Sequence, residues 1–217
     1  MSALWLAAAL SVAPVQTAET VPHRALMLHI DGGLALIDID LPPVPAVYMM
    51  TGELGVAYGL WPGVDVRGRY TTTLGLIHRV GPELRARLLS VGRLAAALRL
   101  HPSLQFAGAA REQLNFGGDL STLSTLMVSH RAWFGAFTGE AGVTVQWLLF
   151  EDIRGRSFVD DEPYLAYVEL SFGYEWATGP RSNLSMRLEL SVPTAPDDPF
   201  TVLGALPRLL FGGSWSL

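Results

Sequence analysis

Apolar and polar residues alternate along most of the chain, and the alternation is longest between residues 84 and 101. In this segment the even positions are leucine, alanine, serine or glycine, whereas the charged and imidazole side chains take odd positions: Arg85, Arg87, Arg93, Arg99 and His101. Side chains two residues apart share one face of a strand, but a helix would scatter them around its axis. The pattern therefore predicts one long β-strand with an apolar face and a cationic face.

Similar alternating segments, separated by residues that favour turns, continue from residue 24 to the C-terminus. We predict ten strands, an even number as in single-chain bacterial barrels, with eight or twelve as the alternatives. The Asp-Gly-Gly sequence at 31–33 is expected to bend or break the first strand, and His130 on the apolar face of the sixth implies a bulge or a shifted register. The predicted strands span residues 24–40, 46–60, 65–79, 84–101, 103–113, 122–136, 141–150, 164–176, 183–192 and a last segment that ends at 217.

The predicted connections fall into two classes. Those after the second, fourth, sixth and eighth strands are short, at 61–64, 101–103, 138–140 and 177–182. Several of the others are longer and more acidic, at 114–121, 151–163 and 193–200. Short and long connections at opposite rims are typical of a transmembrane barrel with short periplasmic turns and longer extracellular loops.

Aromatic residues gather near both predicted rims, where amphipathic rings prefer the membrane interface. A soluble lipocalin-like barrel or β-sandwich is the alternative, but the solvated outer faces of a sandwich would carry polar side chains. One rim has Tyr58, Trp61, Phe134, Phe137, Tyr174, Trp176 and Trp215, and the other has Tyr48, Trp147, Phe150 and Tyr164.

The polar face of these strands predicts the lining of the lumen. Its arginines outnumber its carboxylates, which leaves two interpretations. Either Arg–Glu pairs and water fill the lumen, because buried charges must be paired or hydrated, or the excess of arginine forms an electropositive passage for small anions. The predicted lumen-lining residues are Glu53, Arg67, Arg69, Arg85, Arg87, Arg93, Arg99, Arg111, Arg131, Glu169, Glu175, Arg187 and Glu189.

The composition agrees with a membrane protein of one domain. Hydrophobic residues make up 50% of the 217 residues and charged residues only 16%, against about 25% in soluble domains. The net charge of −5 argues against nucleic acid as a partner. Because the chain has no cysteine, it has no disulfide framework and no thiolate metal site.

The N-terminus carries a short apolar run over residues 1–15, followed by Gln-Thr-Ala-Glu-Thr. The run is too short to span a bilayer as a helix and has the length of a signal-peptide core. We therefore expect a signal peptide over residues 1–18 and a barrel domain over residues 24–217. No later segment has the uncharged apolar length of a transmembrane helix.

The alternation, the leader and the C-terminal sequence Phe-Gly-Gly-Ser-Trp-Ser-Leu at 211–217 together resemble Gram-negative outer-membrane β-barrels as a broad class. The C-terminal sequence is similar to the signal by which the assembly machinery recognises such barrels. The resemblance implies an all-β, antiparallel, up-and-down transmembrane barrel in the cell outer membrane. It also implies outer-membrane lipid and the barrel-assembly machinery as partners, and a monomer.

For function, we expect a structural barrel or a narrow passage for small solutes with an Arg-rich polar lumen, and no catalytic residue, metal or cofactor. The first alternative is a lipid-modifying enzyme or protease on the barrel, which would need a nucleophile, a base and an orienting acid at one rim. His29 and Asp31 share a face, a spacing that also arises often by coincidence. His130 cannot pair simply with the adjacent Ser129, because neighbours on a strand point to opposite faces. His78 and His101 are expected near the rims, in solvent.

Overall fold

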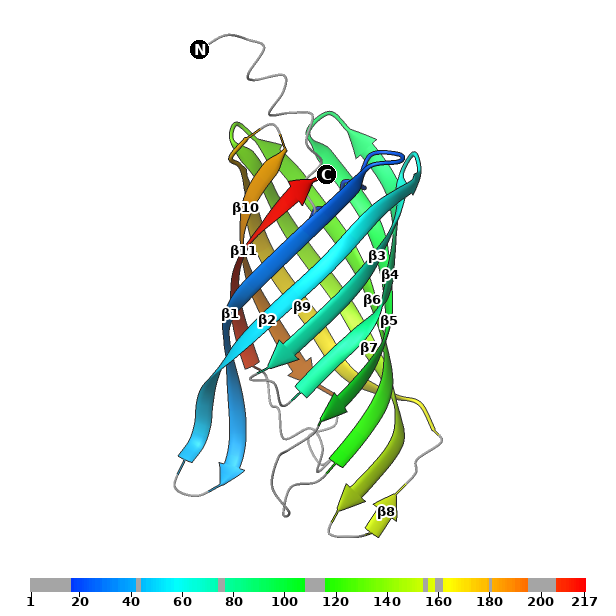
Figure 1. Ribbon diagram of the computed structural model, residues 1–217, viewed down its shortest axis with the longest axis vertical. Coiled ribbons are helices and arrows are strands. Elements are labelled where there is room, and N and C mark those ends of the chain that lie inside the picture. The colour runs from blue at the N-terminus through cyan, green and yellow to red at the C-terminus, as the bar shows by residue number, and fades with distance from the viewer. Residues whose placement is uncertain are drawn as a thin grey trace.

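The strands form one antiparallel sheet that closes into a barrel through the pairing of β6 with β7 (Figure 1). The computed structural model describes residues 17–41, 44–73, 77–107, 116–153, 156–158, 162–179, 181–194 and 206–217. The ten strands of the barrel are β1 (Leu26–Leu41), β2 (Val44–Trp61), β3 (Val64–Thr73), β4 (Ile77–Val91), β5 (Leu94–Ala107), β6 (Phe116–Ala132), β7 (Gly135–Ile153), β9 (Tyr164–Ala177), β10 (Ser182–Pro193) and β11 (Leu206–Ser216). The short β8 (Arg156–Phe158) pairs with the end of β7.

The closed, ten-stranded, up-and-down barrel confirms the predicted fold class. Successive strands are neighbours around the wall, and β1 pairs with β11 to join the first and last strands. The connections after β2, β4, β6 and β9 are short, and they lie at the rim where β11 also ends (Figure 1). We call this rim the short-turn rim. Among the described residues, no helix is long and apolar enough to cross a membrane.

The predicted single strand over 84–101 is wrong, because the chain turns within it. β4 ends at Val91 and β5 begins at Leu94, and Gly92 takes a φ of 61° in the turn between them. Two-residue hairpins favour glycine at this first central position. A bulge between Arg87 and Leu89 exchanges the odd and even positions that face the lumen in the last part of β4, and the turn exchanges them again. The two offsets cancel, so the sequence alternates as though one strand ran through the turn.

The short connections predicted at 101–103 and 138–140 are also wrong, since these residues lie inside β5 and β7. The chain turns instead between β6 and β7 at Trp133 and Phe134, which are 80% and 70% exposed. Gly139, which suggested a turn, lies in β7 with the ring of Phe172 from β9 close to the space that a Cβ would take. An aromatic ring that covers a strand glycine compensates for the missing side chain.

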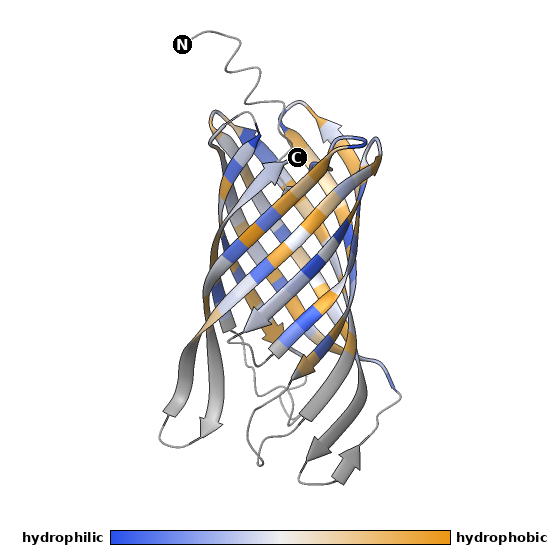
Figure 2. Ribbon diagram, in the orientation of Figure 1, coloured by the Kyte–Doolittle hydropathy of each residue, from blue (hydrophilic) through white to orange (hydrophobic). Residues whose placement is uncertain are grey.

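The outward face of the barrel is apolar. Figure 2 shows hydrophobic and hydrophilic residues alternating along the strands. Outward residues include Leu54, Leu84, Leu98 and Leu126, which are between 44% and 49% exposed. Since a closed barrel satisfies every backbone hydrogen bond between strands, it can present such a surface to lipid.

Two irregularities expected from the sequence are absent from the described strands. β1 runs without a break through Asp31 and the two glycines that follow it. His130 does face outward, but β6 keeps its register with β5 and β7 around it, and its register shift lies at Gly118 and Asp119. His130 therefore needs neither a bulge nor a changed register.

The depth of the apolar belt can be tested with two arginine substitutions on β5. Leu98 and Leu94 are both outward and about half exposed, at 49% and 51%, but Leu94 borders the turn. We expect Leu98→Arg to lower the free energy of unfolding in lipid by about 2–4 kcal/mol and Leu94→Arg by about 0–1 kcal/mol. Urea titration in phospholipid vesicles, followed by tryptophan fluorescence, measures both. Equal losses would contradict the predicted placement of the belt.

The turn between β4 and β5 can be tested with matched glycine substitutions. A Cβ at Gly92 would meet nothing within 4 Å, so its positive φ of 61° is the only obstacle to a side chain. We expect Gly92→Ala to cost about 1–2 kcal/mol of folding free energy. Gly68 has equally open space and no positive φ, so Gly68→Ala is the control and should cost nothing measurable. The same unfolding assay compares them, and equal effects would argue against the hairpin at Gly92.

Candidate functional site

The inward face of the barrel is rich in charged side chains that are almost fully buried. Strand alternation directs them into the lumen, opposite the apolar outer face. All of the following are at most 8% exposed: Asp31, Glu53, Asp65, Arg67, Glu83, Arg85, Arg99, Glu140, Glu175 and Arg187. Charges this deep must be paired, because an isolated buried charge is very costly.

Glu53 on β2 binds partners from three other strands. Its Oε1 lies 2.9 Å from His29 Nε2 on β1. Its Oε2 accepts a hydrogen bond from Arg69 Nη2 on β3, at 2.5 Å, and another from Arg187 Nη2 on β10, at 3.2 Å. Because β1 and β11 lie between β2 and β10, the bond to Arg187 reaches across the lumen rather than along one hairpin.

The pairs at Glu53 belong to a longer series in which positive and negative side chains alternate. Arg69 also pairs with Glu83 at 3.2 Å, and Arg67 lies 3.6 Å from Glu83 and 3.3 Å from Asp65. At the other end, Arg187 lies 3.0 Å from Glu189, which pairs with Arg208 at 3.3 Å. We call the series the luminal charge chain; its members in order are Arg208, Glu189, Arg187, Glu53, Arg69, Glu83, Arg67, Asp65 and Arg85.

The opposite side of the lumen has its own pairs. Arg99 on β5 lies 2.6 Å from Glu140 on β7, reaching over β6 between them. Glu175 accepts a hydrogen bond from Ser214, at 3.1 Å. A small cavity remains here, lined by Thr138, Glu140, Ser171, Gly173, Tyr174, Glu175 and Arg187. Paired side chains therefore come from both halves of the wall.

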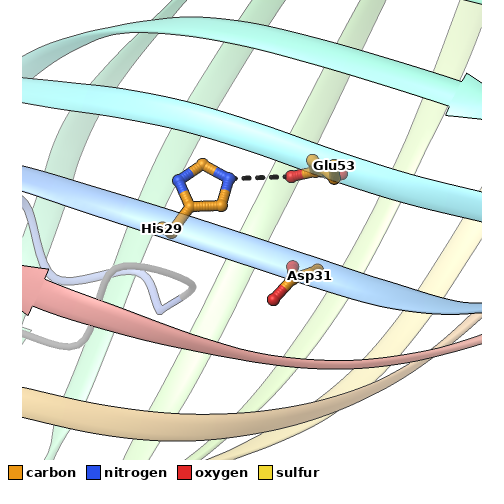
Figure 3. A group of neighbouring side chains, drawn as sticks. All are labelled: His29, Asp31 and Glu53. Atoms are coloured by element: carbon orange, nitrogen blue, oxygen red, sulfur yellow. Dashed lines mark hydrogen bonds and ion pairs between the residues drawn. The ribbon is translucent and has the colours of Figure 1, made fainter.

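His29, Asp31 and Glu53 are close enough together to be considered as metal ligands. One ligand atom from each lies within 4.8 Å of the others, and all three residues are buried (Figure 3). Arg187 Nη2, however, lies 3.6 Å from Asp31 Oδ2 and 3.2 Å from Glu53 Oε2. The guanidinium group already supplies the positive charge that a cation would bring, which weakens the case for a metal.

Room for the imidazole of His29 comes from Gly55 on the neighbouring strand. A Cβ at Gly55 would lie 2.0 Å from the ring carbon Cε1 of His29. The ring lies across this glycine and directs Nε2 toward Glu53. The shared face of His29 and Asp31 was expected to be a coincidence, and the carboxylate within hydrogen-bonding distance of the His29 ring is that of Glu53 on β2.

Most of the arginines and glutamates predicted to line the lumen face inward, with two differences. Arg93 lies in the turn between β4 and β5 and is exposed, because the chain reverses there. Arg87 is also exposed, beside that turn at the short-turn rim, with its Nη2 3.7 Å from the space a Cβ of Gly63 would take. Arg111 lies outside the described residues. The inward and at least partly buried members are Glu53, Arg67, Arg69, Arg85, Arg99, Arg131, Glu169, Glu175, Arg187 and Glu189.

Several carboxylates that face the lumen are absent from the residues predicted to line it. Glu140 was placed in a connection and Glu83 fell between two predicted strands, so neither received an inward assignment. Asp65 shares the parity of Arg67 and could have been found by it. The expected excess of arginine over carboxylate is accordingly smaller, since Asp31, Asp65, Glu83 and Glu140 all lie in the lumen.

Two histidines differ in environment from the solvated rims expected for them. His101 is 2% exposed in the lumen, because β5 continues through it. His78 is half-buried on the outer face, where its ring stacks with Tyr70 and Phe106. Its Nδ1 lies 2.8 Å from the Tyr70 hydroxyl.

Comparison with known proteins gives the fold and little more. No protein-family model matches the sequence, and no curated protein matches it. Among solved structures, the outer membrane protease OmpT from Escherichia coli aligns with a TM-score of 0.54 and 9% identity over 93% of this chain and 100% of that chain.

Two further solved structures align with lower TM-scores. The COG4313 outer membrane channel from Pseudomonas putida F1 aligns with a TM-score of 0.49 and 12% identity, over 95% of this chain and 100% of that one. The outer membrane protein OprG from Pseudomonas aeruginosa aligns with a TM-score of 0.36 and 12% identity, over 93% and 99%. The similarity shows the fold, a closed antiparallel β-barrel of the kind found in outer-membrane proteins.

Proposed function

We propose that the chain is a non-enzymatic outer-membrane barrel whose lumen is held shut by paired charges, leaving at most a narrow path for small solutes. The observation that carries the proposal is the luminal charge chain. It links β11 and β10 to β2, β3 and β4 through side chains that are 0–25% exposed.

The alternating order makes the luminal charge chain rigid. Each interior member has oppositely charged neighbours on both sides, so moving one side chain leaves others unpaired in a buried environment. Breaking a buried pair by removing one partner typically costs about 3–5 kcal/mol. The side chains are therefore expected to stay in place rather than swing aside to open a wide pore.

An electropositive anion passage is less well supported. The luminal charge chain holds five arginines against four carboxylates, and the separate pair Arg99–Glu140 is neutral as a unit. With the charges so nearly balanced, the field inside the lumen favours neither sign strongly. We therefore expect that any path through the lumen passes only small solutes, and that it selects neither anions nor cations.

A hydrolytic site is also less well supported. The side chains of His29 and Glu53 are within hydrogen-bonding distance but only 4% and 2% exposed, so a substrate at a rim cannot reach them. Glu53 is moreover bound to Arg69 and Arg187, which hold it as an ion-pair partner rather than as a base.

Conductance in planar lipid bilayers tests the proposal. We expect the wild-type barrel to conduct little above the bare membrane. Glu53→Gln should raise conductance on the order of tenfold, because Arg69 and Arg187 lose a shared counter-ion and repel each other. The same substitution should also lower the free energy of unfolding by about 3–5 kcal/mol.

Glu169→Gln is the matched control. Glu169 is a luminal carboxylate that accepts hydrogen bonds from Thr144 and Ser191 and is not a member of the luminal charge chain. It should leave conductance unchanged. A large, steady wild-type conductance would overturn the closed lumen. Turnover of a fluorogenic peptide or a phospholipid that disappears in His29→Ala would overturn the non-enzymatic assignment.

A further inference from the structure

The residues just before β1 do not leave the barrel but turn into its lumen at the short-turn rim. Five consecutive residues here are at most 8% exposed: Thr17, Ala18, Glu19, Thr20 and Val21. Their partners are inward side chains of several strands. This segment has no strand periodicity, so its inward path has no local signal in the sequence, and Thr17 and Ala18 fall within the expected leader.

Polar contacts hold the segment to three strands. Arg131 on β6 donates from Nε and Nη2 to the two carboxylate oxygens of Glu19. Arg85 on β4 donates to the carbonyl oxygen of Thr17. The backbone N–H of Val21 donates to Asp65 Oδ2 on β3, at 2.7 Å. The fork of Arg131 on a carboxylate is among the strongest ion-pair geometries.

Alanine side chains on the wall make room for the segment, and methionines pack beside them. Ala18 packs in a cluster whose other members are Ala95, Ala97 and Met127. Val21 packs in a second cluster whose other buried members are Met27 and Ala57. Larger residues in place of these alanines would fill the space that the segment occupies.

A tight reversal connects the segment to β1. The N–H of Ala25 donates to the carbonyl of Pro22 at 2.9 Å, and Arg24 takes a left-handed φ of 63°. Gly59 on β2 fixes this reversal, since it accepts from the Arg24 N–H at 2.8 Å. A Cβ at Gly59 would lie 2.0 Å from the Pro22 carbonyl oxygen, so the close approach requires glycine.

We propose that residues 19–22, the part of this segment beyond the expected leader, are a releasable plug of the short-turn mouth, with the Arg131–Glu19 pair as its latch and the reversal at 22–25 as its hinge. The latch is the solvent-accessible part of the assembly, because the side chains of Arg131 and Glu19 are 34% and 11% exposed. Salt and competing anions can therefore reach it and weaken it. The Arg85–Asp65 pair, at 0% exposure, belongs to the luminal charge chain and persists when the plug is out.

The proposal is independent of whether the rest of the lumen conducts. A released plug would uncover the guanidinium of Arg131 at the mouth and leave the barrel wall intact. Release of the plug would be a local opening that the Arg131–Glu19 pair opposes, at a place distinct from Glu53 and its partners.

A single engineered thiol tests the plug, since the chain contains no cysteine. Val21 is 1% exposed, so Val21→Cys in the folded barrel should react slowly with a water-soluble maleimide. Adding Arg131→Gln should speed the reaction on the order of tenfold, because a hydrogen-bonded charge pair no longer opposes release. Raising the salt concentration should speed labelling while Arg131 is present and have little effect once it is replaced.

Glu169→Gln is again the control, as it removes a luminal carboxylate away from the segment and should leave the labelling rate unchanged. Fast labelling of Val21→Cys alone would overturn the plug, and so would rates that Arg131→Gln does not change. Acceleration by Glu169→Gln as well would show general loosening of the barrel and would also overturn the latch.

Two further variants keep the test decisive if Val21→Cys does not fold. Thr20→Cys, at a position 6% exposed, should repeat the result if Val21→Cys does not fold. Val21→Cys combined with Ala57→Cys should form a disulfide on mild oxidation, because the two side chains share a cluster. A folded double variant that never cross-links would contradict the plug. Because the readout is labelling, it stands apart from the conductance test of the closed lumen.

Discussion

Pairing of guanidinium and carboxylate groups in a space that water hardly reaches is the constraint on which the lumen depends. A barrel that turns its apolar side chains to lipid must turn its polar ones inward, and ten strands leave little volume for solvent. Each charge then requires an opposite charge within reach. The luminal charge chain satisfies this requirement by alternating sign from one strand to the next, so no member except its ends has a single partner.

This arrangement also explains why arginine suits the lumen. A guanidinium group presents several N–H donors in one plane and can bridge two carboxylates, as Arg69 bridges Glu53 and Glu83. An ammonium group would act as a point charge and would bridge less well. Gly55 has a related role, since its missing side chain leaves the space in which His29 approaches Glu53.

The fold could be predicted from the sequence because lipid contact imposes a period of two on every spanning strand. The positions of three connections could not. A bulge in β4 and the hairpin that follows it have opposite effects on the alternation, so the turn leaves no trace in the pattern. Gly139 is a residue type that favours turns, but it lies within β7 and is covered by the ring of Phe172. The turn expected at Gly139 hid Glu140, and a connection expected at 80–83 hid Glu83, although β4 already begins at Ile77. Both omissions exaggerated the positive charge of the lumen. The inward path of residues 17–22 had no local signal at all, because it depends on alanines contributed by distant strands.

The bond between Arg187 and Glu53 has a consequence for how the barrel is assembled. Hairpins between successive strands can form locally, but β1 meets β11 only when nearly the whole chain has been made, as in the pairing of Met27 with Ser216. Glu53 and Arg187 lie on opposite sides of that seam. In an open sheet both would lack this partner, so the ion pair forms only on correct ring closure. The ion pair in the mature lumen thus stabilises the closed barrel relative to an open sheet, whose unpaired edges are prone to aggregation.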